Sequence, residues 1–308
     1  MKTIKAFAPA TVANVSCGFD ILGFALEGMG DWVTVTERES PGLEVISIQG
    51  DGGKLPYDSD KNTCTVAIQA MIDELGINPG IEIQLEKGLP LGSGMGSSAA
   101  SAVAALVAAN ELLGNPFQKN ELLPFAIAAE KVACGAGHAD NVGPSLLGGF
   151  VLIRDYHLLD VIKLPVPEEL HCVLLHPHYQ LNTADSRSVL RDQIPLRHAT
   201  IQSGNVAGLV TGLFQGDFDL ISRSLRDVIA EPYRAVLIPG FYEVREAIKA
   251  AGALGMGISG SGPTLFVLCK GSAPIPGIIT AAQEVFESIG LGVDAYHSAI
   301  NTRGAHIL

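Results

Sequence analysis

Apolar and polar residues alternate in several short stretches of the chain, which is the pattern of strands with one buried face. The alternation is clearest over Asp31–Glu37, Leu43–Ile48 and Ile81–Glu86. Two further strands are predicted over Thr3–Ala8 and Phe150–Arg154. The first half of the chain therefore contributes several strands.

Helical stretches lie between these strands. The pattern predicts one helix that begins near Asn62, with this side chain as its cap, and runs to about Leu75. Residues Ser98–Leu113 are apolar at nearly every position, which predicts a buried helix that ends at Gly114. A third, amphipathic helix is expected over Asn120–Val132.

The second half alternates strands and helices, as an α+β domain does. Turn-forming residues near Asp155–Asp160 indicate a domain boundary before it. The expected elements are strands at Leu170–Leu175, Leu265–Cys269 and Gly292–His297, a helix that begins at Thr183, and helices at Ala199–Phe214, Gly240–Ala251 and Pro276–Ile289.

A glycine-rich stretch, Leu89–Ala100, connects the strand at Ile81–Glu86 to the buried helix. Glycines let a backbone approach an anion closely, and a helix N-terminus adds partial positive charge. The stretch lacks the Gly-Lys-Ser/Thr of a Walker A loop and the spacing of the dinucleotide fingerprint. The local pattern leaves phosphate binding and a plain strand–helix connection equally open.

Two other stretches are rich in turn-forming and polar residues. Ala8–Gly23 combines Pro, Asn, Gly and Asp, and its simplest interpretation is a connection between two strands. Gly135–Gly149 carries His138, Asp140 and Asn141 among many glycines, which favours a functional loop. An isolated histidine is more often structural, so this pattern alone does not assign a role.

Composition narrows the function classes. The chain of 308 residues is 47 % hydrophobic and 17 % charged, with a net charge of −12. This balance predicts a well-packed globular protein and argues against nucleic-acid or anionic-membrane partners, which need basic surface. Five scattered cysteines have no metal-ligand spacing. Without an apolar leader or an 18-residue apolar run, we expect a soluble cytoplasmic protein.

The glycine-rich stretch, Pro90-Leu-Gly-Ser-Gly-Met-Gly-Ser-Ser-Ala-Ala100, resembles the ATP-phosphate loop of the GHMP kinases. The glycines of Gly255–Thr264 resemble the third motif of that family, which packs against the phosphate loop. The N-terminal stretch is similar to the homoserine kinase signature of the family. It agrees at Pro9, Ala10, Thr11, Ala13, Asn14, Gly18, Phe19 and Asp20, and departs at Val12, Val15, Ser16 and Cys17.

The resemblance implies an α+β, two-domain GHMP kinase fold. Its N-terminal ATP-binding domain, ribosomal-protein-S5-like, would span residues 1–155, and its ferredoxin-like C-terminal domain residues 156–308. The active site would lie between them, and we expect a homodimer. The activity implied is phosphoryl transfer from ATP to the γ-hydroxyl of L-homoserine, a step of threonine biosynthesis, with Mg²⁺ as cofactor.

The resemblance also implies residue roles. The ATP-binding residues would be Asn62, Pro90, Leu91, Gly92, Ser93, Gly94, Met95, Gly96, Ser97, Ser98, Ala99 and Ala100. Ser98 and Glu130 would hold Mg²⁺, which prefers hard oxygen ligands. The substrate-binding residues would be Asn14, Asp20, His138, Asp140, Arg187 and Arg234, since a zwitterion needs both carboxylates and guanidinium groups.

The catalytic residues implied are Asn141, Asp140 and Arg187. Asp140 has two alternative roles: it is the general base, or it serves the substrate ammonium while the γ-phosphate accepts the proton. We favour the second, in which Asn141 only orients the hydroxyl. Two other functions stay open. One is a GHMP kinase for another alcohol, such as mevalonate or a sugar, and the other is a non-catalytic nucleotide-binding protein of the same fold.

Overall fold

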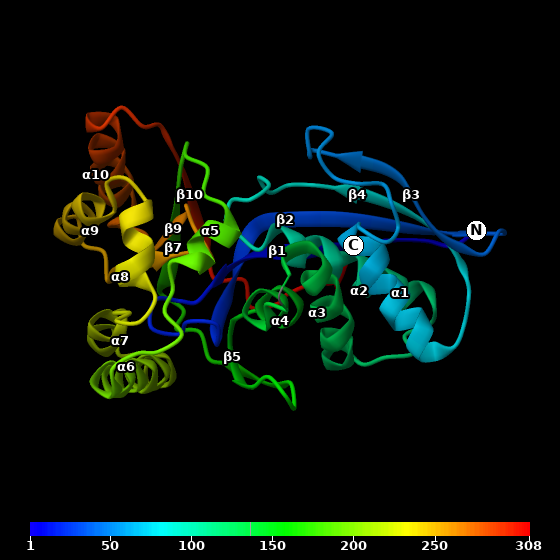
Figure 1. Ribbon diagram of the computed structural model, residues 1–308, viewed down its shortest axis with the longest axis horizontal. Coiled ribbons are helices and arrows are strands. Elements are labelled where there is room, and N and C mark those ends of the chain that lie inside the picture. Colours follow the sequence, from blue (N-terminus) through cyan, green and yellow to red (C-terminus); the bar gives the residue numbers. More distant parts are fainter. Residues whose placement is uncertain (136) are drawn as a thin grey trace.

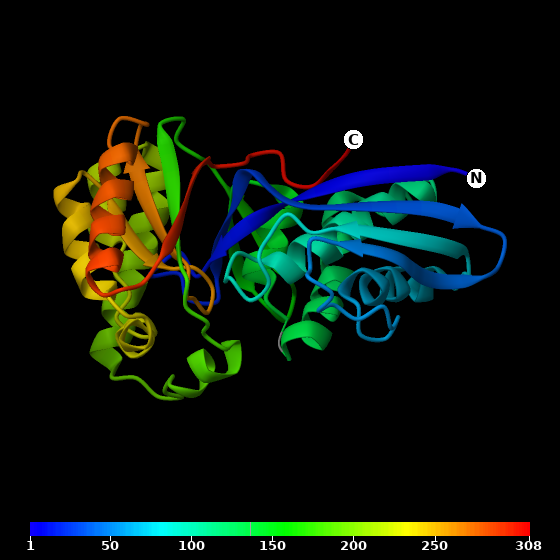
Figure 2. The ribbon, with the colours of Figure 1, turned by 90° about the horizontal axis from the view of Figure 1, so that it is seen from above.

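The computed structural model of the protein describes residues 1–135 and 137–308. It has two lobes, each with one sheet and several helices, as the α+β prediction requires (Figure 1). The N-terminal lobe ends in a long pair of strands that reaches toward the second lobe (Figure 2). Segments far apart in the sequence therefore meet where the lobes join.

The N-terminal lobe contains a seven-stranded sheet. Its main path has the order β11-β1-β2-β4-β3, and β5 pairs with β2 and β6. β3 and β4 are parallel, whereas the other pairs are antiparallel. The strands are β1 (Thr3–Ala13), β2 (Leu22–Arg38), β3 (Gly42–Gln49), β4 (Gly80–Glu86), β5 (Phe150–Asp155), β6 (Asp160–Leu164) and β11 (His306–Ile307).

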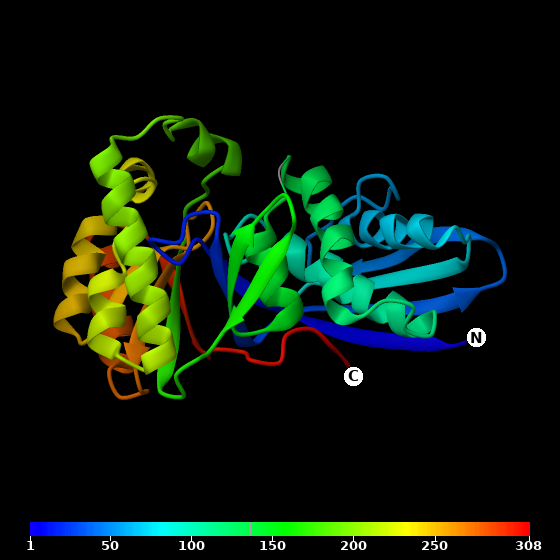
Figure 3. The same cartoon turned by 90° about the horizontal axis from the view of Figure 1, so that it is seen from below.

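Helices cover one face of this sheet (Figure 3). The alanine-rich helix α2 and helix α4 pack on β1 and β2, and α1 and α3 pack against α2. Small alanine side chains allow α2 to be buried on nearly all sides, in a core shared with the sheet. The helices are α1 (Thr63–Leu75), α2 (Ser97–Leu112), α3 (Leu123–Cys134) and α4 (Ala139–Leu147), with a 3₁₀ turn at Lys119–Leu122.

The C-terminal lobe has a four-stranded sheet in the order β10-β7-β9-β8. Helices α9 and α10 enclose an apolar core on one face, while α6 and α7 border the other. Its strands are β7 (Leu170–Pro177), β8 (Gly255–Ile258), β9 (Leu265–Lys270) and β10 (Val293–Ala299). Its helices are α5 (Thr183–Ser188), α6 (Leu196–Gln215), α7 (Phe218–Ser224), α8 (Glu231–Arg234), α9 (Phe241–Ala250) and α10 (Ile275–Ser288), with a 3₁₀ turn at Ala235–Leu237.

Several elements differ from the sequence-based expectation. β1 continues to Ala13, into the stretch interpreted as a connection, and β6, β8 and β11 have no predicted counterpart. β2 begins at Leu22, well before the predicted strand at Asp31–Glu37. The glycine-rich segment that we expected to be a loop contains helix α4, even though Gly143 and Pro144 lie inside it. Burial of most of this helix outweighs its poor intrinsic helix propensity. In the described part of the chain, none of the helices combines the length and the apolar character needed to cross a membrane.

Candidate active site

The glycine-rich loop between β4 and α2 has a backbone that favours glycine. Gly92, Gly94 and Gly96 all have positive φ, between 66° and 80°. A Cβ on Gly94 would lie 2.5 Å from the carbonyl oxygen of Ser259, and a Cβ on Gly96 only 2.0 Å from Oγ1 of Thr11. The glycines therefore serve both the left-handed turns and the close packing around the loop.

Both lobes hold this loop in place. The backbone N–H of Thr11, in β1, donates to the carbonyl of Met95 at 3.0 Å. The hydroxyl of Ser259 donates to the carbonyl of Gly94 at 2.7 Å. The expected packing of the Gly255–Thr264 motif against the loop is therefore present, and the loop reaches the N-terminus of α2 in a fixed position.

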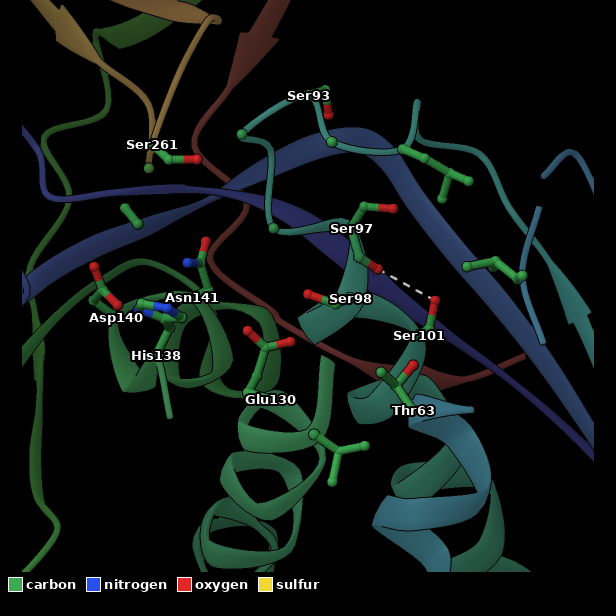
Figure 4. Close-up of a pocket in the computed structure, with 18 of the residues that line it drawn as sticks. Thr63, Ser93, Ser97, Ser98, Ser101, Glu130, His138, Asp140, Asn141 and Ser261 are labelled. Atoms are coloured by element: carbon green, nitrogen blue, oxygen red, sulfur yellow. Dashed lines mark hydrogen bonds between the residues drawn. The ribbon is translucent and has the colours of Figure 1, made fainter. Parts of the chain in front are cut away.

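A cavity of about 560 Å³ lies in front of the loop, between the two lobes (Figure 4). It brings together most of the site residues that the sequence predicts. Those that line it are Asn14, Asp20, Asn62, Leu91, Gly92, Ser93, Gly94, Gly96, Ser97, Ser98, Glu130, His138, Asp140, Asn141, Arg187 and Arg234.

Four predicted ATP-binding residues do not line this cavity. Pro90 and Met95 border a different, smaller cavity of about 300 Å³. Ala99 and Ala100 have fully buried side chains in the core. The N–H of Ala100 donates to the carbonyl of Gly96 within the helix, so it is already used.

Oxygen atoms converge where α2 and α3 meet the cavity. Glu130 on α3 is 2 % exposed, and its Oε1 has no hydrogen-bond partner among the described residues. Burial raises the pKa of Glu130 to about 7, although a hydrogen bond with Ser98 and the charge of Lys87 act in the opposite direction. The hydroxyl of Ser97, also buried there, makes no hydrogen bond to the described residues.

Asp140 lies in the first turn of α4 and lines the same cavity. Its side chain is 1 % exposed, and its Oδ1 has no partner in the described part of the chain. Burial raises the pKa of Asp140 to about 7, and the nearby charge of Asp20 adds to this effect. The site thus contains two buried carboxyl groups, and neighbouring charges and hydrogen bonds do not fully offset the cost of burying their ionised forms.

The guanidinium group of Arg187 contacts Asp20 and His138 in the same cavity. Nη2 of Arg187 lies 3.3 Å from Oδ1 of Asp20 and 3.3 Å from Nδ1 of His138. Burial, followed by the charge of Arg187, lowers the pKa of His138. The imidazole is therefore favoured in its neutral form, which can accept a hydrogen bond.

Arg234, at the end of α8, is 4 % exposed. Its Nε donates to the carbonyl of Ser186 at 3.1 Å, and its Nη1 donates to the carbonyl of Gly260 at 3.2 Å. The guanidinium group also lies over the ring of Phe19, at 5.1 Å from the ring centroid. These contacts hold the planar guanidinium group of Arg234 in place, and the residue still lines the cavity.

Asp20 is held in an unusual backbone conformation, with φ of 59°. Its N–H donates to Oδ1 of Asn14 at 2.9 Å, and its carbonyl accepts a hydrogen bond from the hydroxyl of Tyr156. Nδ2 of Asn14 in turn donates to the carbonyl of Gly260 at 2.7 Å. Strained residues of this kind persist only where the surroundings hold them, and here both lobes contribute.

Sequence reasoning missed Tyr156 and Lys87. Lys87 forms a buried ion pair with Asp31, and its Nζ also donates to the carbonyl of Ser97 and the hydroxyl of Ser101, each at 2.8 Å. The ammonium group therefore fixes the start of α2 beside the cavity. A lysine at a strand end is usually solvated, so its only local signal was its place directly before the glycine-rich loop.

Asn62 lines the cavity next to α1. Its Oδ1 accepts from the N–H of Cys64 at 3.0 Å, which makes it the helix cap that the sequence predicts. Its Nδ2 donates to the carbonyl of Pro56 at 2.8 Å. Together with Leu55, Pro56 and Val132, this residue forms a largely apolar part of the wall.

Two family models match the chain. Residues 62–149 match the GHMP kinases N terminal domain, and residues 209–288 match the GHMP kinases C terminal model. The homoserine kinase of Chlorobium phaeovibrioides is 51 % identical over 320 residues, with both chains fully covered. That of Xanthomonas campestris is 41 % identical and covers all of this chain and 95 % of its own.

A solved structure agrees closely. The homoserine kinase from Cytophaga hutchinsonii superposes with a TM-score of 0.97 at 51 % identity, covering 100 % of this chain and 98 % of the other. A galactokinase from Lactococcus lactis has a TM-score of 0.74 at 17 % identity, which shows a shared fold alone. With these matches and the glycine-rich loop facing a charged cavity, the chain belongs to the GHMP kinase family, among the homoserine kinases.

Proposed function

We propose that this protein transfers the γ-phosphoryl group of ATP to the γ-hydroxyl of L-homoserine, giving O-phospho-L-homoserine for threonine biosynthesis. The observation that carries the proposal is the pairing within one cavity of a phosphate-type loop with a set of charges that matches a zwitterion. The full-length similarity to proteins named homoserine kinase supports the choice of substrate. Mevalonate and sugars lack an ammonium group, so Asp20 and Asp140 would have no cation to bind in them.

The phosphate end of the site is suited to ATP. Backbone N–H groups of Leu91–Ser97 and the N-terminus of the 16-residue helix α2 provide partial positive charge. The buried hydroxyl of Ser97 can donate to a phosphate oxygen. We propose that the adenine lies beside Asn62, against the apolar wall formed by Leu55, Pro56 and Val132.

Ser98 and Glu130 fit a Mg²⁺ ion by their chemistry. Both are hard oxygen donors at the cavity wall, and the buried Oε1 of Glu130, which has no hydrogen-bond partner among the described residues, is the clearest indication. Two protein ligands would suffice, because Mg²⁺ in proteins commonly takes its other ligands from water and substrate phosphate. When bound, the ion would neutralise charge on the transferring group.

The amino-acid end binds the zwitterion. Arg187 and Arg234 would hold the carboxylate through their planar forks, and Asp20 and Asp140 would pair with the ammonium group. Asn14 and His138 complete this end, Asn14 by holding the N–H of Asp20 and His138 as a neutral acceptor. Each charged group of the substrate then has a partner of opposite sign.

The chemical step forms a bond between the substrate γ-oxygen and the γ-phosphorus and breaks the bond from that phosphorus to ADP. The hydroxyl proton passes to an oxygen of the transferring phosphoryl group, because a loose transition state does not require early deprotonation. Asn141 orients the hydroxyl, and Asp140 serves the ammonium group. Arg187, near both Asp20 and His138, orders this end of the site.

A coupled assay of ADP release across homoserine, mevalonate, galactose and shikimate tests the proposal. We expect kcat/KM for homoserine to exceed that for each other alcohol by orders of magnitude. Comparable turnover of mevalonate or galactose would assign the protein to another GHMP activity, and ATP binding without turnover of any alcohol would assign it a non-catalytic role.

We add proposals on the oligomeric state, the cellular location and the domain boundaries of the protein. We propose a homodimer, which light scattering on the purified protein would test against a monomer. We propose a cytoplasmic location, supported by the four buried, unpaired cysteines among the described residues, Cys17, Cys64, Cys172 and Cys269. We also propose the division into domains at residues 1–155 and 156–308, with two exceptions: β6 pairs with β5 and β11 pairs with β1, so both strands go with the N-terminal domain. Limited proteolysis would check this division.

A further inference from the structure

Thr11 lies behind the cavity, outside its lining, yet contacts two parts of the site. It belongs to β1 and is fully buried. Its hydroxyl donates to Oδ1 of Asn141 at 2.8 Å, and its backbone N–H donates to the carbonyl of Met95 in the phosphate loop. One residue therefore connects the loop to the side chain proposed to orient the substrate hydroxyl.

The hydrogen bond distinguishes the two ends of the Asn141 amide. Its Oδ1 accepts from Thr11, so the Nδ2 end is the one left to act on a ligand as a donor. In Figure 4 this nitrogen lies on the side of Asp140 and His138. The backbone N–H of Asn141 donates to the carbonyl of His138 at 3.1 Å and so limits movement of the residue as a whole.

Packing leaves little room for another arrangement. A Cβ on Gly96 would lie 2.0 Å from Oγ1 of Thr11 and 2.9 Å from Oδ1 of Asn141. The hydroxyl and the amide oxygen thus pack directly against the last residue of the phosphate loop. Because the terminal torsion of an asparagine is broad and roughly two-fold, its amide needs such a partner to fix which end faces the cavity.

We propose that Thr11 is a positioning residue that presents the Asn141 amide to the substrate as a hydrogen-bond donor. The proposal rests on the function proposed above and adds which group is the donor in the hydrogen bond between Asn141 and the substrate hydroxyl. Nδ2–H donates to the γ-oxygen of homoserine, which leaves the hydroxyl proton pointing elsewhere. An amide nitrogen does not accept a proton, so Asn141 orients the hydroxyl without acting as its base, and the Thr11 hydroxyl acts only through Asn141.

Thr11→Val tests the role because valine has nearly the same shape but no hydroxyl. We expect kcat to fall about tenfold, since one hydrogen bond no longer fixes the amide, while KM for ATP changes less than twofold. Thr11→Ser is the matched control, because it keeps the hydroxyl and should restore most of kcat. If Thr11→Val does not fold, Thr11→Ser against Thr11→Ala gives the same comparison.

The decisive measurement is a double-mutant cycle with Asn141→Ala. If Thr11 acts through Asn141, adding Thr11→Val to Asn141→Ala causes no further loss of kcat. Equal loss in both backgrounds, or wild-type kcat in Thr11→Val, would overturn the proposal. The wild-type enzyme in the same assay separates this outcome from failure of the proposed function: if it prefers another alcohol, the cycle is run with that alcohol.

Discussion

Replacement of Asp140 by asparagine separates the two roles open to this carboxylate. The side chain keeps its size and loses its charge, in a position that is 1 % exposed and whose Oδ1 has no partner among the described residues. Burial and the charge of Asp20 raise the pKa of Asp140 to about 7. A pKa near the working pH suits a general base, while a buried carboxylate beside a second one also suits an ammonium ligand.

The two roles predict different magnitudes. Loss of one partner from a buried charge pair costs roughly 2–5 kcal/mol, which corresponds to a KM for homoserine about 30- to 5,000-fold higher. In that case kcat and the acidic limb of the pH–rate profile persist. A general base would instead contribute about 10²–10⁴-fold to kcat, and its removal would eliminate the limb. We expect the first pattern.

The assay measures initial rates of ADP release at saturating ATP, with homoserine varied between pH 5.5 and 9. A substrate analogue sharpens it: 4-hydroxybutanoate keeps the hydroxyl and the carboxylate but lacks the ammonium group. If Asp140 binds the ammonium, the penalty of Asp140→Asn largely disappears with this analogue. The reasoning is refuted if kcat collapses, the limb vanishes, KM for homoserine stays constant and the penalty persists with the analogue.

The remaining predictions concern metal, substrate and stability. Glu130→Gln should lower kcat by orders of magnitude in a folded protein, because loss of a charged metal ligand commonly costs a few kcal/mol; full activity at low Mg²⁺ would contradict this. Arg234→Leu and Asp20→Ala should each raise KM for homoserine far more than KM for ATP, and an unchanged KM for homoserine in both would indicate another acceptor. Because burial raises the folded pKa of Glu130 and Asp140 to about 7, both hold protons that the unfolded chain has lost above pH 5. The free energy of unfolding of the ligand-free protein should therefore fall by roughly 3–4 kcal/mol per group as pH rises from about 4 to about 8. Thermal melts should show a shallower decline for Glu130→Gln, and an identical decline would argue against the raised pKa.

Hydrophobic patterning predicted the strands and helices whose apolar periodicity is regular, such as β4 and α2. It did not predict helix α4, because Gly143 and Pro144 oppose helix formation locally. The helix forms where packing against β1, β2 and β5 buries it, and a Cβ on Gly143 would already lie 3.0 Å from Val151. These packing contacts come from the tertiary structure, so no periodic pattern of apolar residues in the sequence predicts them.

The candidate site was only partly accessible from sequence. The glycine-rich loop is contiguous and therefore visible, but Asp20 and Arg187 lie 167 positions apart and meet only because both lobes border one cavity. The resemblance to known kinases supplied these residues, whereas local chemistry did not. Lys87 and Thr11 were missed as site residues because their roles depend on buried partners from other elements.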